Sequence, residues 1–142
     1  MAAWKRIGCA VDFSDGSHAA LAEATALAVR FGAGLVLLHA EELTGVTDIP
    51  PPQSVVESTR RELEAKLAEW KAEAERGLDR EVEDHMIPGP AAPKIARAAA
   101  ERGLDLLVTG THGRRGFRRL VLGSVAERLV HLAPCAVLVV RA

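Results

Sequence analysis

Residues 105–125 read DLLVTGTHGRRGFRRLVLGSV, and this stretch decides how the fold is predicted. An apolar run ends at Gly110, a basic loop with more glycines follows, and Gly123 and Ser124 open the next amphipathic segment. Glycine permits close backbone approach and positive φ angles, and a helix N-terminus adds unpaired N–H donors. The order of strand, glycine-rich loop and helix N-terminus therefore predicts a site for a phosphate chain.

The spacing of these residues also fits a purely structural interpretation. Ser124 and Glu127 have the spacing of a capping box, in which the serine side chain closes the start of its own helix. In this interpretation the glycines only make turns. The arginines between them would form a solvated face.

Short apolar runs alternate with amphipathic segments along the chain. Strands are predicted at residues 7–11, 35–38, 80–87, 105–109 and 136–140. Helices are predicted after Ser14 as far as Gly32, from Ser54 to about Arg76 with a stop at Gly77, and at residues 92–102 and 124–132. The alternation predicts a parallel sheet with helices on both faces, and right-handed crossovers make it doubly wound. The polar strand at 80–87 is expected at an edge, and a ligand at the carboxyl ends of the strands.

Length and composition narrow the class of protein. The 142 residues suit one domain, 1–142, and 18 basic against 19 acidic side chains give a net charge of −1. This balance does not indicate nucleic acid or a membrane surface as a partner. The sequence has no signal-peptide layout at its start, and we expect a cytoplasmic protein. Cys9 and Cys135 lie in apolar runs, which predicts buried, unreactive thiols.

The sequence resembles the universal stress protein family over essentially its whole length. Residues 110–124 match that family's ATP-binding motif, Gly-x2-Gly-x9-Gly-Ser, without a gap. Residues 11–14 (VDFS) resemble its first-strand signature, and residues 134–140 (PCAVLVV) resemble its last strand. The resemblance implies a three-layer, five-stranded parallel sheet with the strand order 3-2-1-4-5, of the adenine nucleotide alpha hydrolase-like type.

The resemblance also implies a site for ATP, or for AMP or ADP, with any Mg²⁺ held through the phosphates. Asp12 would contact the ribose or the adenine, Ala10 would line the adenine pocket, and Ala40 would offer backbone groups to the base. Some family members carry proline where this chain has Ala10. The remaining implied contacts lie in the motif or directly beside it. They are Thr109, Gly110, His112 and Gly113 at the ribose and α-phosphate, and Gly123, Ser124 and Val125 at the β- and γ-phosphates.

Several of these side chains have simpler interpretations. Asp12 follows a strand and can cap the next helix, and His112 can bond within its own loop. His39, His85 and His112 could converge as a metal site, but no short ligand spacing supports one, and no metal ligands are assigned.

The function implied by the resemblance is that of a nucleotide-sensing regulator of the stress response, acting as a homodimer. The dimer would form through the last strand, Val137, Leu138, Val139 and Val140, because an open apolar edge needs covering. No general base stands out, so we assign no catalytic residue and expect hydrolysis to be slow at most. The alternatives are a slow ATPase or nucleotidyl-transferring enzyme on the same scaffold, and a nucleotide-free dimeric interaction module.

Overall fold

Strands and helices alternate regularly in the computed structural model, which describes residues 3–42, 49–111 and 122–142. The described elements, in chain order, are β1 Arg6–Ala10, α1 Asp15–Phe31, β2 Gly34–Glu41, α2 Gln53–Leu78, β3 Glu83–Pro88, α3 Ala91–Glu101, β4 Leu106–Gly110, α4 Ser124–Leu132 and β5 Ala136–Val140.

The five described strands form one parallel sheet with the order β3-β2-β1-β4-β5. This is the predicted order 3-2-1-4-5, and it puts the polar strand β3 at one edge, as expected, and β5 at the other. The chain leaves β1 in one direction to build β2 and β3, and returns to the other side of β1 for β4 and β5. The strand order therefore reverses between β1 and β4, which is where such sheets bind ligands.

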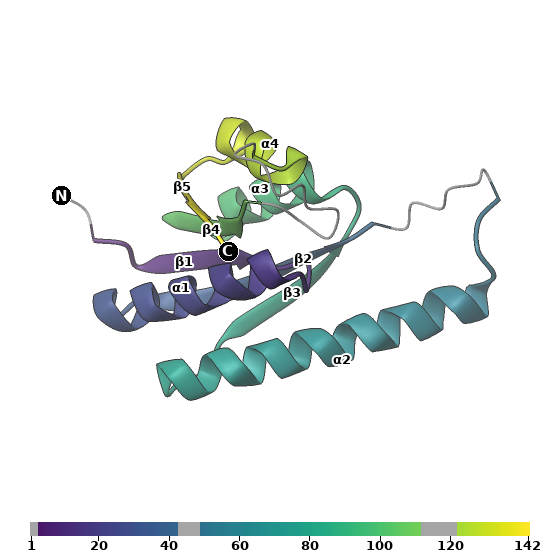
Figure 1. Cartoon of the computed structure of the whole chain (residues 1–142), viewed down its shortest axis with the longest axis horizontal. Helices are drawn as coiled ribbons and strands as arrows, with labels where there is room; N and C mark the ends of the chain where they lie inside the picture. The colour runs from purple at the N-terminus through teal and green to yellow at the C-terminus, as the bar shows by residue number, and fades with distance from the viewer. Residues whose placement is uncertain (1–2, 43–48, 112–121) are drawn as a thin grey trace.

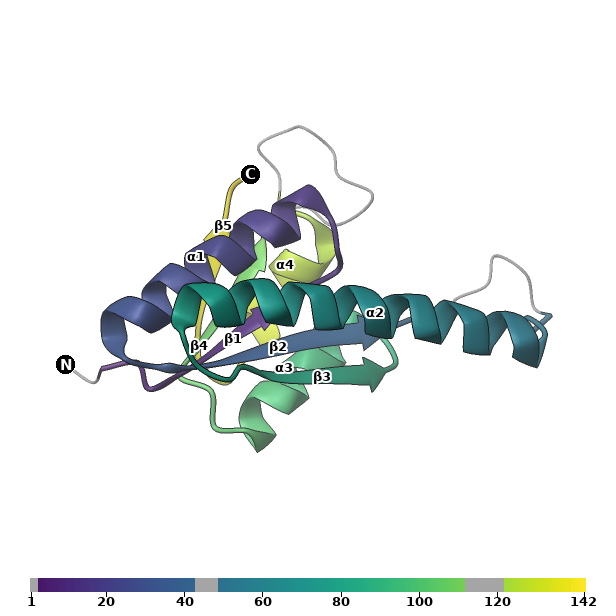
Figure 2. The same cartoon turned by 90° about the horizontal axis from the view of Figure 1, so that it is seen from below.

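Helices cover both faces of the sheet (Figures 1 and 2). Alternate residues of β1 point to opposite faces: Ile7 and Cys9 pack with α1 and the second half of α2, whereas Ala10 packs with α3. All three side chains are at most 7% exposed. Because both faces of the sheet are buried, the central strands read as continuous apolar runs.

The first helix begins and ends where the sequence predicts. Ser14 is the N-cap of α1 and accepts a hydrogen bond from the Ser17 amide, while Gly32 ends the helix in the left-handed conformation.

The second helix differs from its prediction at both ends. It begins at Gln53 after Pro52, with no side-chain cap, so Ser54 does not open it. It also continues through Gly77 and ends at Leu78, and the C-cap residue Asp79 takes the left-handed conformation. The first half of α2 extends past the sheet (Figure 2), and its first buried residue is Leu67. In the described part of the chain, no helix is long and apolar enough to cross a membrane.

Candidate functional site

The two ends of the glycine motif meet at the carboxyl edge of the sheet. The Gly123 amide donates a hydrogen bond to the Thr111 carbonyl oxygen at 2.6 Å, and the Thr111 amide donates to the Val140 carbonyl oxygen at 3.1 Å. The residue after β4 and the residue before α4 are thus joined directly, although residues 112–122 separate them in the sequence. Among the described residues, Thr111 of the first glycine cluster therefore lies beside Gly123 of the second.

Within the described residues, no side chain caps the N-terminus of α4. Gly123 is the N-cap residue, with φ −61° and ψ 158°, and Ser124 is the first residue of the helix. The first intrahelical bond runs from the Glu127 amide to the Gly123 carbonyl oxygen at 2.9 Å. The alternative in which Ser124 caps its own helix is therefore wrong. The amides of the first turn and the positive end of the helix dipole have the chemistry to bind an anion.

Gly110 allows β4 to approach the start of α1. A Cβ atom at this position would lie 2.8 Å from the carbonyl carbon and oxygen of Gly16 and 3.2 Å from the Ser17 nitrogen. These are backbone atoms, which cannot rotate away. Glycine is required here for close packing, and this packing holds the motif beside the turn that follows β1.

That turn presents Asp12. The Asp12 amide donates to the Ser17 hydroxyl at 2.9 Å, and the Asp12 Oδ1 atom accepts hydrogen bonds from the amide and the hydroxyl of Ser14. Because Ser14 caps α1, the alternative that Asp12 caps this helix is wrong. Asp12 is half-buried, and among the described residues its Oδ2 atom has no hydrogen-bond partner. Sequence reasoning missed Ser17, which is buried and positions this turn.

The structure brings most of the predicted site residues to one edge. Ala10 and Thr109 are buried and lie on neighbouring strands, and Ala40 is half-buried at the end of β2. The residues found at the carboxyl edge are Ala10, Asp12, Ala40, Thr109, Gly110, Gly123, Ser124 and Val125. The predicted residues His112 and Gly113 lie outside the described residues.

The histidines at the strand ends do not converge. His39 pairs with Met86 in the sheet, and His85 pairs with Leu38, so the two imidazoles project to opposite faces. The His39 Nδ1 atom donates to the Val11 carbonyl oxygen at 2.7 Å. Nowhere in residues 3–42, 49–111 and 122–142 do three or more His, Cys, Asp or Glu side chains form a metal-binding group.

Phe13 is a second residue that the sequence did not single out. It is half-buried and has φ 65°, a conformation that costs a non-glycine residue about 1–3 kcal/mol. Its ring lies 4.7 Å from the His39 ring and 5.1 Å from the Trp70 ring, measured between centroids. The turn that presents Asp12 therefore packs against β2 and α2 through the Phe13 ring. The only signal in the sequence is a large apolar residue inside a polar turn.

The fold and this edge define a class, the doubly wound parallel α/β proteins that bind ligands where the strand order reverses. The model of the universal stress protein family matches residues 3–141. A universal stress protein of Thermus aquaticus is 37% identical over 139 residues, which cover 97% of this chain and 99% of that protein. One from Methanocaldococcus jannaschii is 32% identical over 142 residues, covering 97% and 82%. The chain belongs to the universal stress protein family.

Solved structures with the same fold are similar to this chain. Universal stress protein UspA from Lactobacillus plantarum has a TM-score of 0.86 at 23% identity, covering 99% of this chain and 100% of its own. A universal stress protein in complex with cAMP has a TM-score of 0.72 at 24% identity, covering 99% and 98%. The Archaeoglobus fulgidus protein in complex with dAMP has a TM-score of 0.68 at 21% identity, covering 97% and 98%. At these identities the likeness shows the fold.

Proposed function

We propose that this protein binds an adenine nucleotide, with ATP as the expected ligand, and acts as a nucleotide-sensing regulator of the stress response in the cytoplasm. The observation that carries the proposal is the hydrogen bond from the Gly123 amide to the Thr111 carbonyl, at 2.6 Å. It joins the two ends of the motif beside an uncapped helix N-terminus. The relatives of the same fold that hold cAMP and dAMP add support, because both ligands combine adenine with a phosphate.

The chemistry of the edge suits each part of the nucleotide. The amides of Ser124 and Val125 can donate to phosphate oxygens, which the helix dipole also attracts. The Asp12 carboxylate can accept a hydrogen bond from a ribose hydroxyl through Oδ2. Backbone groups at Ala40 can bond the edge of the base, and the small Ala10 side chain leaves room beside it. AMP and ADP would occupy the same positions, and Mg²⁺ would be held through the phosphates.

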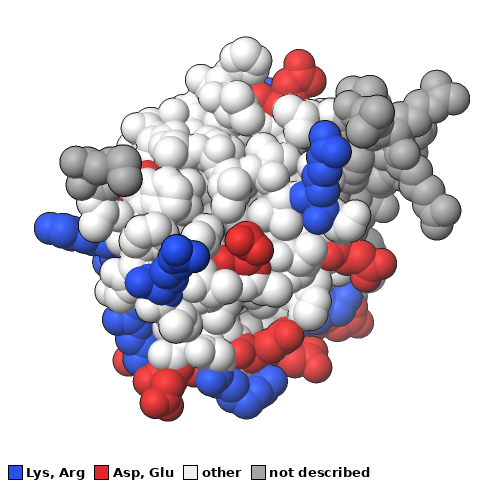
Figure 3. Space-filling model, turned by 60° about the vertical axis from the view of Figure 1, so that its left-hand side comes forward, with Lys and Arg blue, Asp and Glu red and all other residues white. Residues whose placement is uncertain are grey.

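A homodimer through β5 completes the proposal. β5 pairs only with β4 in the described sheet, and its outer edge has unpaired backbone groups beside partly exposed valines. Such an edge favours pairing with another strand. Figure 3 shows one face of the molecule, on which charged side chains are sparse over the upper part and gather along the lower border.

Two measurements test the nucleotide proposal. Mass spectrometry of the small molecule that co-purifies with the protein should show an adenine nucleotide. ATP titrated into nucleotide-free protein should bind the wild type, and it should bind Asp12→Ala about tenfold or more weakly, as expected for a lost hydrogen bond to a charged group.

Asp15→Ala is the matched control, because Asp15 is exposed on the first turn of α1. It should bind ATP as the wild type does. Equal binding by all three proteins would reject the assignment of Asp12, and no binding by the wild type would reject the function. Phosphate release in a single turnover distinguishes a binding protein from a slow ATPase.

A further inference from the structure

The strand end next to the proposed adenine contact carries a buried carboxylate. Glu41 follows Ala40, and its side chain is 3% exposed. The Glu41 Oε2 atom lies 3.4 Å from the Arg60 Nε atom of α2, while Oε1 has no hydrogen-bond partner within the described residues. A buried carboxylate is costly unless it is paired. The position of the Glu41 carboxylate therefore depends strongly on its pairing with Arg60.

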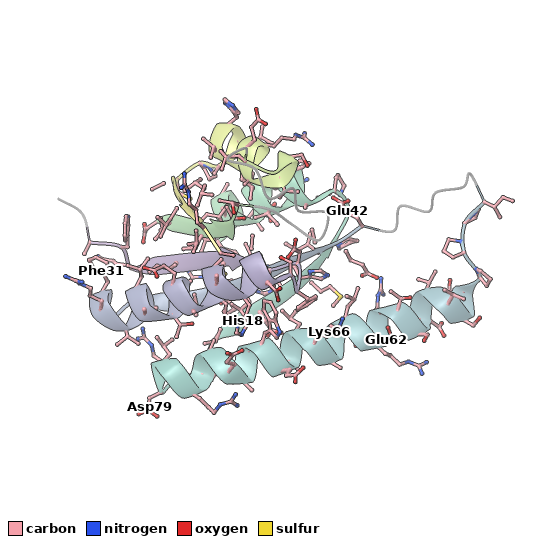
Figure 4. The ribbon with its side chains drawn as sticks, viewed as in Figure 1. His18, Phe31, Glu42, Glu62, Lys66 and Asp79 are labelled. Carbon is pink, nitrogen blue, oxygen red and sulfur yellow. The ribbon has the colours of Figure 1, made fainter. Side chains whose placement is uncertain are left out.

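The next residue ties the same strand end to the opposite layer. The Glu42 Oε1 atom accepts a hydrogen bond from the Ala91 amide at 2.6 Å, at the start of α3. The Gly89 amide donates to the Glu41 carbonyl oxygen at 3.0 Å, which adds the turn after β3. Figure 4 shows Glu42 at the end of β2, between the layer of α2 and the layer of α3. Two consecutive carboxylates thus hold β2 to helices on both faces of the sheet.

Arg60 lies in the half of α2 that extends past the sheet. Within the described part of the chain, its bond to Glu41 is the one ion pair that joins residues 53–63 to the sheet, since Arg61 pairs with Glu57 of its own helix. No residue of α2 before Leu67 is buried, so packing holds this half weakly. Among the described residues, the position of this half of α2 therefore depends on one polar contact, the Arg60–Glu41 pair, which lies next to Ala40.

We propose that Glu41 and Glu42 are positioning residues that couple occupancy of the nucleotide site to the packing of the first half of α2. The proposal rests on the proposed function, because it takes Ala40 as the adenine contact. A base bonded to the Ala40 backbone fixes the end of β2, and this holds the Glu41 carboxylate in reach of Arg60. By linkage, the effect is reciprocal: breaking the Glu41–Arg60 pair weakens nucleotide binding.

The test compares two neighbouring arginines on the same helix. Arg60→Met removes the partner of the buried carboxylate, whereas Arg61→Met removes only a surface pair with Glu57. Hydrogen exchange of residues 53–63 is measured with and without ATP, and the dissociation constant for ATP is measured by titration. In the wild type and in Arg61→Met, ATP should slow exchange in this segment. In Arg60→Met the slowing should disappear, and the dissociation constant should rise about fivefold or more.

The outcomes separate the two proposals. If the wild type does not bind ATP, the proposed function and this coupling both fail. If the wild type binds ATP, and Arg60→Met retains both the dissociation constant and the ATP-dependent protection, only the coupling fails. Should Arg60→Met not fold, Glu41→Gln replaces it, because the amide keeps the shape of the side chain and removes the buried charge. Glu41→Gln should lose the same protection, and retention of the protection would overturn the coupling.

Discussion

Replacing Gly110 by alanine tests whether close packing of β4 on α1 builds the site. The new methyl group would lie 2.8 Å from the Gly16 carbonyl carbon and oxygen, inside normal contact distance. Relief requires the backbone of α1 or β4 to move, because no flexible side chain stands at this point. Such a movement would also separate the motif from the turn that presents Asp12.

The expected change in stability of Gly110→Ala is the difference between two opposing effects. Overpacking of this kind costs about 1–3 kcal/mol, while alanine stabilises by about 0.4–1 kcal/mol through a less flexible unfolded chain. The midpoints of these two ranges leave a net loss of stability of about 1.3 kcal/mol, which for a domain of this size lowers the Tm by about 4–5 °C.

The assay is thermal unfolding of Gly110→Ala beside Gly34→Ala. The control also replaces a strand-end glycine, but its Cβ atom would lie 3.8 Å from the Lys5 carbonyl oxygen, an ordinary contact. Gly34→Ala should keep the wild-type Tm or raise it by up to about 4 °C, because it gains the unfolded-chain effect without overpacking. A Gly110→Ala protein with the same Tm and the same ATP affinity as this control would refute the packing argument.

Three further predictions concern the rest of the fold. Backbone hydrogen bonds from two amides lower the pKa of Asp105. The Asp105 carboxylate therefore stabilises the fold above the unfolded pKa of about 4, and this stabilisation is lost as the pH falls through the lower folded pKa. In urea denaturation from pH 5 to pH 2, the free energy of unfolding of Asp105→Asn should fall less steeply with pH than that of the wild type. Cys9 is buried, as the sequence predicts, and burial raises its pKa to about 12, whereas the prediction of a buried Cys135 is wrong because this residue is partly exposed. A thiol reagent should therefore modify Cys135 alone in the native protein, and modification of Cys9 at a similar rate would contradict its burial. Ser14→Ala should lower the free energy of unfolding by about 1 kcal/mol, because α1 loses its cap, and an unchanged urea midpoint would show that the cap contributes nothing.

The parallel sheet was predictable because burial on both faces leaves a clear pattern in the sequence, whereas the strand order was implied by the resemblance to the universal stress protein family. β1 and β4 read as short apolar runs, and parallel strands place their carboxyl ends at one edge. That rule is sufficient to bring Asp12, Gly110 and Ser124 together. The prediction that Ser14 caps α1 also succeeded, because a cap is a local interaction between residues close in the chain.

Features that depend on distant partners were not predictable. Gly77 was expected to stop its helix, but it lies against α1, where a Cβ atom would be 2.9 Å from the Thr25 Cγ2 atom. This close contact between helices outweighs the local preference of glycine. Glu41 gave no signal either, because its burial depends on Arg60, which lies far along the chain. The packing of the Phe13 ring likewise involves distant partners, the rings of His39 on β2 and Trp70 on α2.

The most direct test of the nucleotide site is a titration of the ¹⁵N-labelled, nucleotide-free protein with ATP, followed through its backbone amide signals. The account predicts saturable shifts that are largest at the carboxyl edge of the sheet. The amides expected to shift most are Asp12, Ala40, Thr111, Ser124 and Val125. Shifts confined to the opposite edge, around Lys5 and Asp105, or no shifts with excess ATP, would contradict it.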